Sequence, residues 1–401
     1  MSKAETKVSN DVGNFFAVDR RTWRYACLRG INPAVVYLVL ARGSDRHQRS
    51  TSWSVNAVEK YTKISRDRAA KAITDLERVG LLVVLQRGTK PRYQISPAYE
   101  VADCEGYQPD AKEIKEWEKW IDEDPFFEGP VPSATRTRWR ELENRLMSRG
   151  AVRSGPTGGL ALPPEEQKPD WIWLPNSLVD GVGDNRFGSV EQVRQLRSID
   201  ALRLLVDLYH AHSLAGDGGV HWQILGQKYT RQNLWAEGPW VIYGFDQPGP
   251  MTCTSSFLFG ADLPEDMKSI DGREQDISST AFWAAWRVLV DLGLVQVVAH
   301  LIDDDTAEAE IIHPYAIKCG EVAERAVAAA AADAAKRLLP SSVRQAALTD
   351  KLNLVPVGAR ITKLEMVGIP RLRYPPLTAT TAAWSSRMPE WREKIAEYNA
   401  L

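Results

Sequence analysis

Basic and hydroxyl side chains recur between residues 46 and 92 at spacings that would let them face a polyanion together. The candidates for phosphate and base contacts are Ser65, Arg66, Arg68, Lys71, Thr74, Arg78, Arg87, Lys90 and Arg92, with Arg46 and Arg49 in the loop before them. Guanidinium and ammonium groups donate hydrogen bonds to phosphate oxygens and to base edges, and hydroxyl groups contact phosphates. The set therefore predicts nucleic-acid binding.

Two short helices and a hairpin are expected to position these side chains. Ser54 is a candidate N-cap for a first helix of about two turns, and Ser65 for a second helix that runs to Val79 and stops at Gly80. Apolar residues recur in the second helix at spacings of three and four, which predicts one buried stripe: Ala69, Ala72, Ile73, Leu76 and Val79. Residues 81–86 and 93–96 are strand-like, and residues 87–92 form a basic turn.

This order of elements resembles the winged helix-turn-helix superfamily, in particular its regulator and replication-initiator modules, over residues 32–97. The segment ISRDRAAKAITDLERVGLL carries the pattern, with Ile64 and Ser65 at the turn and Leu76, Gly80 and Leu81 at the entry to the wing. Upstream, Asn32 as N-cap and Pro33 at the first helical position would begin the module's first helix. The resemblance implies that the second helix enters the major groove of DNA while the hairpin rests on the backbone.

The charge of the chain is divided unevenly along its length. Residues 1–100 hold 18 Lys and Arg against 9 Asp and Glu, a net charge of +9, whereas the remainder carries −11 and the whole chain −2. A basic region on an acidic body is typical of an electrostatic footprint confined to one domain.

We predict an α+β, mainly α fold with tandem winged helix-turn-helix modules, a helical linker and a C-terminal helical extension. The expected domains are 1–100, the basic winged helix; 101–170, a helical connector with a Pro- and Gly-rich linker; 171–318, a second winged-helix-like module; and 319–401, an Ala-rich helix and extension. In the second module, GVHWQILGQKYT parallels SWSVNAVEKYT, residues 231–276 are an insertion, and Gly293 takes the place of Gly80.

The second module differs from the first in its chemistry. Phe282, Trp283 and Trp286 stand where the first module has cations, and Asp303, Asp304 and Asp305 form its hairpin tip. Exposed aromatics with few charges are typical of a protein interface, so these three are candidate interface residues. The alternative is that they pack against the 231–276 insertion.

An enzymatic function lacks its usual motifs. The sequence has no P-loop, dinucleotide-binding fingerprint or nucleophile elbow. His210 and His212 are two residues apart and would not share a helix face, so we expect no metal site. The four cysteines, Cys27, Cys104, Cys253 and Cys319, are isolated, which favours reduced thiols. We therefore expect neither catalysis nor a cofactor.

The amino-terminal MSKAETKVSND is polar, and no run of eighteen apolar residues occurs. These features predict a cytoplasmic, nucleoid-associated protein with no membrane contact. The function expected is sequence-directed binding of double-stranded DNA in transcription regulation or replication initiation of a bacterium, phage or mobile element. The protein would act as a homodimer or recruit a replication or regulatory partner through the second module. The alternative is a non-catalytic docking subunit of a larger assembly, such as a defence or anti-defence complex.

Overall fold

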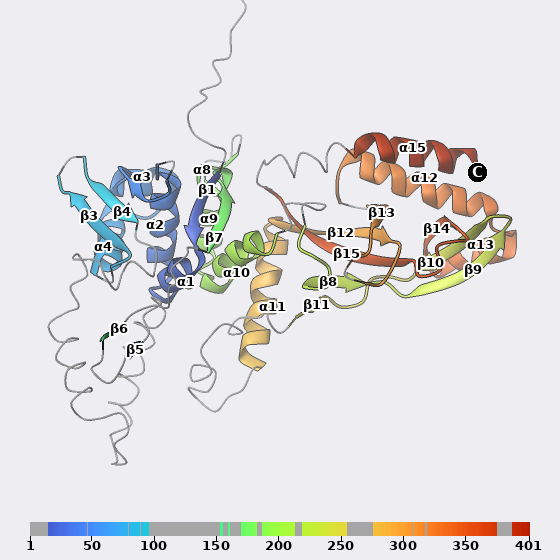
Figure 1. The fold of residues 1–401 in the computed structure, drawn as a ribbon, viewed down its shortest axis with the longest axis horizontal. Coiled ribbons are helices and arrows are strands. Elements are labelled where there is room, and N and C mark those ends of the chain that lie inside the picture. The colour runs from blue at the N-terminus through green and yellow to red at the C-terminus, as the bar shows by residue number, and fades with distance from the viewer. Residues whose placement is uncertain are drawn as a thin grey trace, which may run out of the picture. The chain divides into compact units, whose positions relative to one another are not determined.

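The computed structural model describes residues 15–45, 47–78, 80–88, 90–95, 153–154, 159–160, 170–182, 187–212, 219–254, 276–306, 308–316, 319–374 and 387–401 (Figure 1). They fall into two compact units. Unit 1 comprises Met1–His210 with Ala284–Val288, and unit 2 comprises Ala211–Trp283 with Leu289–Leu401.

Unit 1 contains a two-stranded antiparallel sheet whose strands lie far apart in the sequence. β1 (Phe15–Asp19) pairs antiparallel with β7 (Trp171–Pro175), from Phe15 opposite Pro175 to Asp19 opposite Trp171. Asp19 caps α1 (Arg20–Leu28) by accepting hydrogen bonds from the backbone N–H and the hydroxyl of Thr22, 2.9 and 2.7 Å away. A further hydrogen bond, from the N–H of Asp170 to Asp19, ties the start of β7 to the same carboxylate.

A three-helix, three-strand motif follows. α2 (Ile31–Arg42) is buried from Ala34 to Ala41, which explains its uniformly apolar sequence. After it come β2 (Ser50–Thr51), α3 (Val55–Tyr61), α4 (Arg66–Arg78), β3 (Leu82–Gln86) and β4 (Arg92–Ile95). The three strands form an antiparallel sheet in the order β2-β4-β3.

Two of the later helices of unit 1 pack against α2. The further described elements of this unit include the short pair β5 (Arg153–Ser154) and β6 (Gly159–Leu160), and the helices α8 (Ser177–Asp180), α9 (Ser189–Gln195) and α10 (Ile199–His210). α8 and α9 contact α2, while α10 packs on β7. An ion pair of 2.7 Å between Arg42 of α2 and Asp180 of α8 reinforces this packing.

Unit 2 contains two antiparallel sheets. One has five strands in the order β11-β8-β15-β12-β13: β11 (Thr252–Cys253), β8 (Leu225–Lys228), β15 (Glu365–Leu372), β12 (Val295–Ile302) and β13 (Ile311–Pro314). The other has the order β14-β10-β9: β14 (Asn353–Gly358), β10 (Trp240–Phe245) and β9 (Arg231–Glu237).

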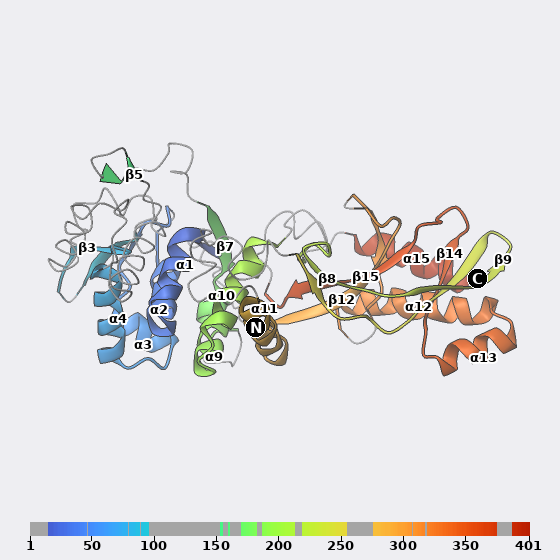
Figure 2. The same cartoon turned by 90° about the horizontal axis from the view of Figure 1, so that it is seen from below.

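Helices cover these sheets. They are α12 (Val322–Leu338), α13 (Ser341–Thr349) and α15 (Met388–Ala400). α12 and α15 lie side by side (Figures 1 and 2). The small alanines of α12 let it approach the sheet closely, and Ala331 and Ala334 join Phe245 and Leu301 in one apolar core. α11 (Asp276–Asp291) precedes β12, and its residues 284–288 belong to unit 1.

The expectation of a mainly α fold is wrong. Of the residues that the structure describes, 43% are helix and 27% are strand, in several antiparallel sheets. The expected second winged helix is not formed either, because the segment GVHWQILGQKYT, which parallels the helical segment SWSVNAVEKYT, contains strand β8 at residues 225–228. The predicted insertion supplies β9, β10 and β11, and β12 pairs along its length with β15. Residues 171–175, at the start of the segment assigned to that module, form β7, which pairs with β1 of unit 1.

Two of the three predicted interface aromatics are buried. Phe282 is fully buried and Trp286 is 6% exposed, while Trp283 is half-buried with its ring 4.9 Å from that of Phe282. These side chains therefore serve the packing of α11, and the interface expectation is corrected. The helical connector predicted within 101–152 lies outside the described residues.

Candidate nucleic-acid interface

α4 separates an apolar stripe from a polar face. Ala69, Ala72, Ile73 and Leu76 are at most 5% exposed, as their spacing predicted. The polar face is exposed at every position the sequence assigned to it: Ser65, Arg66, Arg68, Lys71, Thr74 and Arg78. Ser65 precedes the helix, and its carbonyl accepts the N–H of Ala69 at 2.9 Å. The apolar stripe thus fixes which face α4 presents to solvent.

The end of α4 aims the following strand. Gly80 has a φ of 75°, its N–H donates to the carbonyl of Glu77, and the N–H of Leu81 donates to that of Leu76. These two bonds form a Schellman motif, in which glycine relieves the strain of a left-handed conformation. The chain therefore turns sharply into β3, and the β3–β4 hairpin lies next to α4.

The predicted start of α2 needs correction, whereas that of α3 is confirmed. α2 begins at Ile31 with Gly30 as N-cap, so Asn32 and Pro33 lie inside its first turn. Ser54 is the N-cap residue of α3, but its side chain makes no capping hydrogen bond.

Four exposed cations form no ion pair with another described residue: Arg68, Lys71, Lys90 and Arg92. Arg68 and Lys71 come from the first half of α4, whereas Lys90 and Arg92 come from the tip of the hairpin and the start of β4. Their charges are available to an external anion without the loss of an internal contact.

Three other predicted cations are paired within the motif. Arg66 lies 2.7 Å from Glu59, Arg78 lies 3.1 Å from Asp75, and Arg87 lies 2.5 Å from Glu77. Exposed ion pairs of this kind contribute only about 0–1 kcal/mol, so a phosphate can compete for each cation. The sequence named these arginines but not their acidic partners.

Asp75 differs from the other two acids because it also binds a second helix. Nε and Nη2 of Arg29, the C-cap residue of α1, donate to its two carboxylate oxygens at 3.0 and 2.7 Å. Burial acts to raise the pKa of Asp75, but the hydrogen bonds from Arg29 and Arg78 prevail and hold it below its ordinary value. This carboxylate therefore stays charged and anchors α4.

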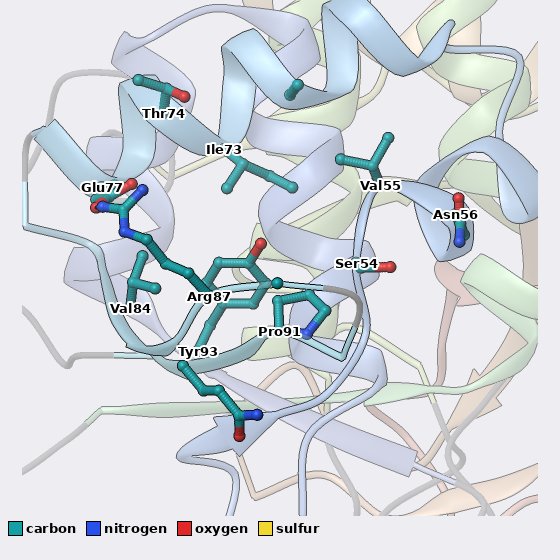
Figure 3. Close-up of a pocket in the computed structure, with 13 residues that line it drawn as sticks. Ser54, Val55, Asn56, Ile73, Thr74, Glu77, Val84, Arg87, Pro91 and Tyr93 are labelled. Atoms are coloured by element: carbon teal, nitrogen blue, oxygen red, sulfur yellow. The ribbon is translucent and has the colours of Figure 1, made fainter.

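A groove of about 600 Å³ lies between α4, the start of α3 and the hairpin (Figure 3). Its walls mix apolar and polar side chains: Ser54, Val55, Asn56, Ala70, Ile73, Thr74, Glu77, Val84, Gln86, Arg87, Gly88, Pro91 and Tyr93. The sequence identified Thr74 and Arg87 but not the groove, since residues 54–56 and 84–93 meet only through the sheet order. The groove is thus lined by α4, by the start of α3 and by the hairpin, and Arg87 is its lining cation.

A stack of rings and cations supports α3 beside this groove. The rings of Trp53 and Tyr61 are parallel and 4.8 Å apart, with Arg42 over Trp53 at 5.5 Å and Lys60 over Tyr61 at 4.7 Å. Gly43 makes room for the stack, because a Cβ there would lie 2.1 Å from Cγ of Trp53. The stack holds the start of α3 against the end of α2.

The loop before α3 is organised by Asp45, which accepts hydrogen bonds from the backbone of His47 and Arg49 and from the hydroxyl of Ser50. Arg49 is half-buried, so it is less accessible than the cations of α4. Arg46 lies outside the described residues.

The described ranges contain no group of three or more His, Cys, Asp or Glu side chains placed to hold a metal ion. Cys27, Cys253 and Cys319 are free thiols, and burial raises the pKa of each. Cys104 lies outside the described residues. A raised pKa keeps these thiols protonated and weakly nucleophilic.

Comparison with protein-family models, curated proteins and solved structures gave no match to this chain. In the part of the chain that the structure describes, every helix is too short or too polar to cross a membrane.

Proposed function

We propose that unit 1 binds double-stranded DNA as a winged helix, with α4 in the major groove and the β3–β4 hairpin on the backbone. The observation that carries this proposal is the placement of four exposed cations, Arg68, Lys71, Lys90 and Arg92, on one helix and its neighbouring hairpin without an ion-pair partner among the described residues.

Both the order of the elements and the order of the strands support the proposal. α2, β2, α3, α4 and the β3–β4 hairpin follow one another as in the winged helices that the sequence resembles. The major groove is about 12 Å wide and admits an α-helix. Because Arg68 and Lys71 lie in the first half of α4, they would enter the groove first, while Lys90 and Arg92 would follow the phosphates.

The biological role we propose is sequence-directed regulation of transcription or initiation of replication in a bacterium, phage or mobile element. Unit 2 would then serve self-association or the recruitment of a regulatory or replication protein. The alternative of a docking subunit receives no support from α11, whose aromatic side chains are buried or half-buried.

The test is a duplex-binding titration by fluorescence anisotropy, with a target first selected from a random duplex library. Arg68→Ala is expected to cost about 1–3 kcal/mol and to relax preference at one base pair if the side chain contacts guanine. Lys90→Ala should weaken all duplexes alike and reduce the salt slope by about one.

Arg392→Ala is the matched control, since Arg392 is an exposed cation of α15 in unit 2 that forms no ion pair with a described residue. If neither Arg68→Ala nor Lys90→Ala alters duplex affinity relative to Arg392→Ala, the proposed function is wrong.

A further inference from the structure

Glu77 is an acidic side chain on the face of α4 that we expect to meet DNA. It lines the groove one helical turn beyond Ile73 and Thr74, and its side chain is 28% exposed. A carboxylate at such a position repels phosphates and lowers affinity for every duplex. A carboxylate at this position is therefore expected to have a role that offsets this loss of affinity.

The partner of Glu77 supplies one. Arg87 extends from the hairpin across the groove, and its Nη2 lies 2.5 Å from Oε1 of Glu77 (Figure 3). Glu77 and Arg87 are the two charged residues among those that line the groove, and their charges neutralise each other. The pair also joins α4 to the hairpin over ten residues of sequence.

The ion pair itself is weak, so what opposes the transfer of Arg87 to a phosphate is the Glu77 charge that the transfer would expose. Arg87 is 78% exposed, and solvent screens an ion pair at such a site to about 0–1 kcal/mol. A loosely placed backbone would gain little by taking Arg87, because that step leaves the Glu77 carboxylate uncompensated beside phosphates. A duplex that matches the DNA-contacting surface of unit 1 gains other contacts. It can therefore bind while Arg87 remains paired with Glu77.

We propose that Glu77 is a specificity-determining residue: by holding Arg87 it withholds one cation from phosphates, and it thereby limits binding to duplexes of unrelated sequence. This inference rests on the proposed function. It assigns Arg87 a positioning role in the free protein, whereas Lys90 and Arg92 remain the backbone contacts of the hairpin.

The test compares Glu77→Gln with the wild type on the selected duplex and on a scrambled duplex over a range of salt concentrations. The substitution frees Arg87 without changing the shape of the side chain. For the scrambled duplex we expect a salt slope steeper by about one and an affinity higher by about fivefold to tenfold near 0.1 M salt. The ratio of selected to scrambled affinity should fall, because phosphate contacts are common to all sequences.

Asp67→Asn is the matched control. Asp67 is exposed on the same helix and forms no ion pair with a described residue, so its loss removes one negative charge but releases no cation. We expect its salt slope to equal that of the wild type. The double variant Glu77→Gln/Arg87→Ala should return the slope to the wild-type value, and thermal melting of each variant confirms that it is folded.

The outcomes separate the two proposals. Salt-dependent duplex binding by the wild type, with Glu77→Gln indistinguishable from Asp67→Asn, overturns the role of Glu77 and leaves the proposed function intact. A wild type that binds no duplex overturns both.

Discussion

Arg29, the C-cap residue of α1, and Asp75 of α4 form a two-point ion pair, in which Nε and Nη2 of the arginine each donate to a different carboxylate oxygen. The side chains are 21% and 23% exposed, so the pair is partly shielded from solvent. Two parallel hydrogen bonds are stronger than a single one, and they fix the orientation of the guanidinium plane relative to the carboxylate plane. The orientation of α4, and with it the placement of the proposed DNA contacts, therefore depends on a helix that is distant in sequence.

Arg29→Lys is expected to destabilise unit 1 by about 1 kcal/mol, because an ammonium group cannot donate to both oxygens in the same plane. Asp75→Asn should cost about 1–2 kcal/mol, since it weakens the bonds from both Arg29 and Arg78. Urea unfolding measures both changes, with Asp67→Asn as the control for loss of a carboxylate on α4. Equal unfolding midpoints for Arg29→Lys and the wild type would contradict the importance of the two-point geometry.

Gly43→Ala is expected to destabilise unit 1 by about 1–3 kcal/mol, because the added Cβ overlaps Trp53 and forces its ring away from Arg42 and Tyr61. A change in tryptophan fluorescence should accompany the lower melting temperature. Gly358→Ala serves as the control, since no atom lies within 4 Å of a Cβ at that position. The packing argument is wrong if the two variants melt alike.

The stability of unit 2 should fall as the pH drops from about 6.5 to about 4. Burial lowers the pKa of His313 to about 4, and its geometry fits the neutral ring, with Nδ1 donating to the carbonyl of Pro314 and Nε2 accepting from the hydroxyl of Tyr398. Because the folded pKa lies below the unfolded value, the unfolded chain binds more protons in this window. The contribution of the neutral His313 ring to the free energy of unfolding is complete above pH 6.5 and amounts to about 3 kcal/mol.

Urea unfolding at pH 7 and pH 4.5 checks this expectation. His313→Gln should flatten part of the pH dependence. His300 contributes to the same pH dependence, because burial and the nearby charge of Arg371 also hold its pKa well below its ordinary value. An unchanged pH profile in His313→Gln would rule out His313 as a source.

Glu324→Gln is expected to be the most damaging of these substitutions, at about 3–5 kcal/mol. Glu324 is fully buried and accepts a 2.6 Å hydrogen bond from Nη1 of Arg371, whose Nη2 lies 2.5 Å from Nε2 of His300. Removing one member leaves a buried guanidinium without its counter-charge. Thermal melting tests this, with Glu390→Gln, which alters an exposed pair with Arg387, as the control. Similar losses in the two variants would show that burial does not govern the cost.

The parts of unit 1 that could be predicted from sequence are those set by local rules. The apolar spacing of Ala69, Ala72, Ile73 and Leu76 fixes a helix face, and Gly80 permits the turn that ends it. The acidic partners were missed because side-chain pairing depends on the tertiary fold. Arg29 and Asp75 are 46 residues apart, and Glu77 meets Arg87 only because the hairpin folds beside α4.

The expected repeat in the second half failed for the same physical reason. Gly293 does end α11 with the bonds that Gly80 makes, from its own N–H to Val290 and from Leu294 to Leu289. That similarity is local. The strand that follows pairs with β15, some seventy residues later, and nothing in the spacing of residues 295–302 indicates this partner.

The strand content of unit 2 was underestimated in part because two of its strands, β14 and β15, are buried on both faces. β15 is buried from Met366 to Leu372, and β14 from Leu354 to Val357. Such strands show no alternation of polar and apolar residues, and a short apolar run cannot be told from a helix segment by its periodicity.

The pairing of β1 with β7 bears on how unit 1 can be divided. A fragment that ends at Ile95 would lose the neighbour of β1, the α8 and α9 contacts to α2, and the Asp180 partner of Arg42. The exposed edge of β1 and the exposed apolar surface of α2 would promote aggregation. The helix and hairpin that we propose to bind DNA are therefore not expected to fold as an isolated fragment. Truncated variants should retain the chain through His210.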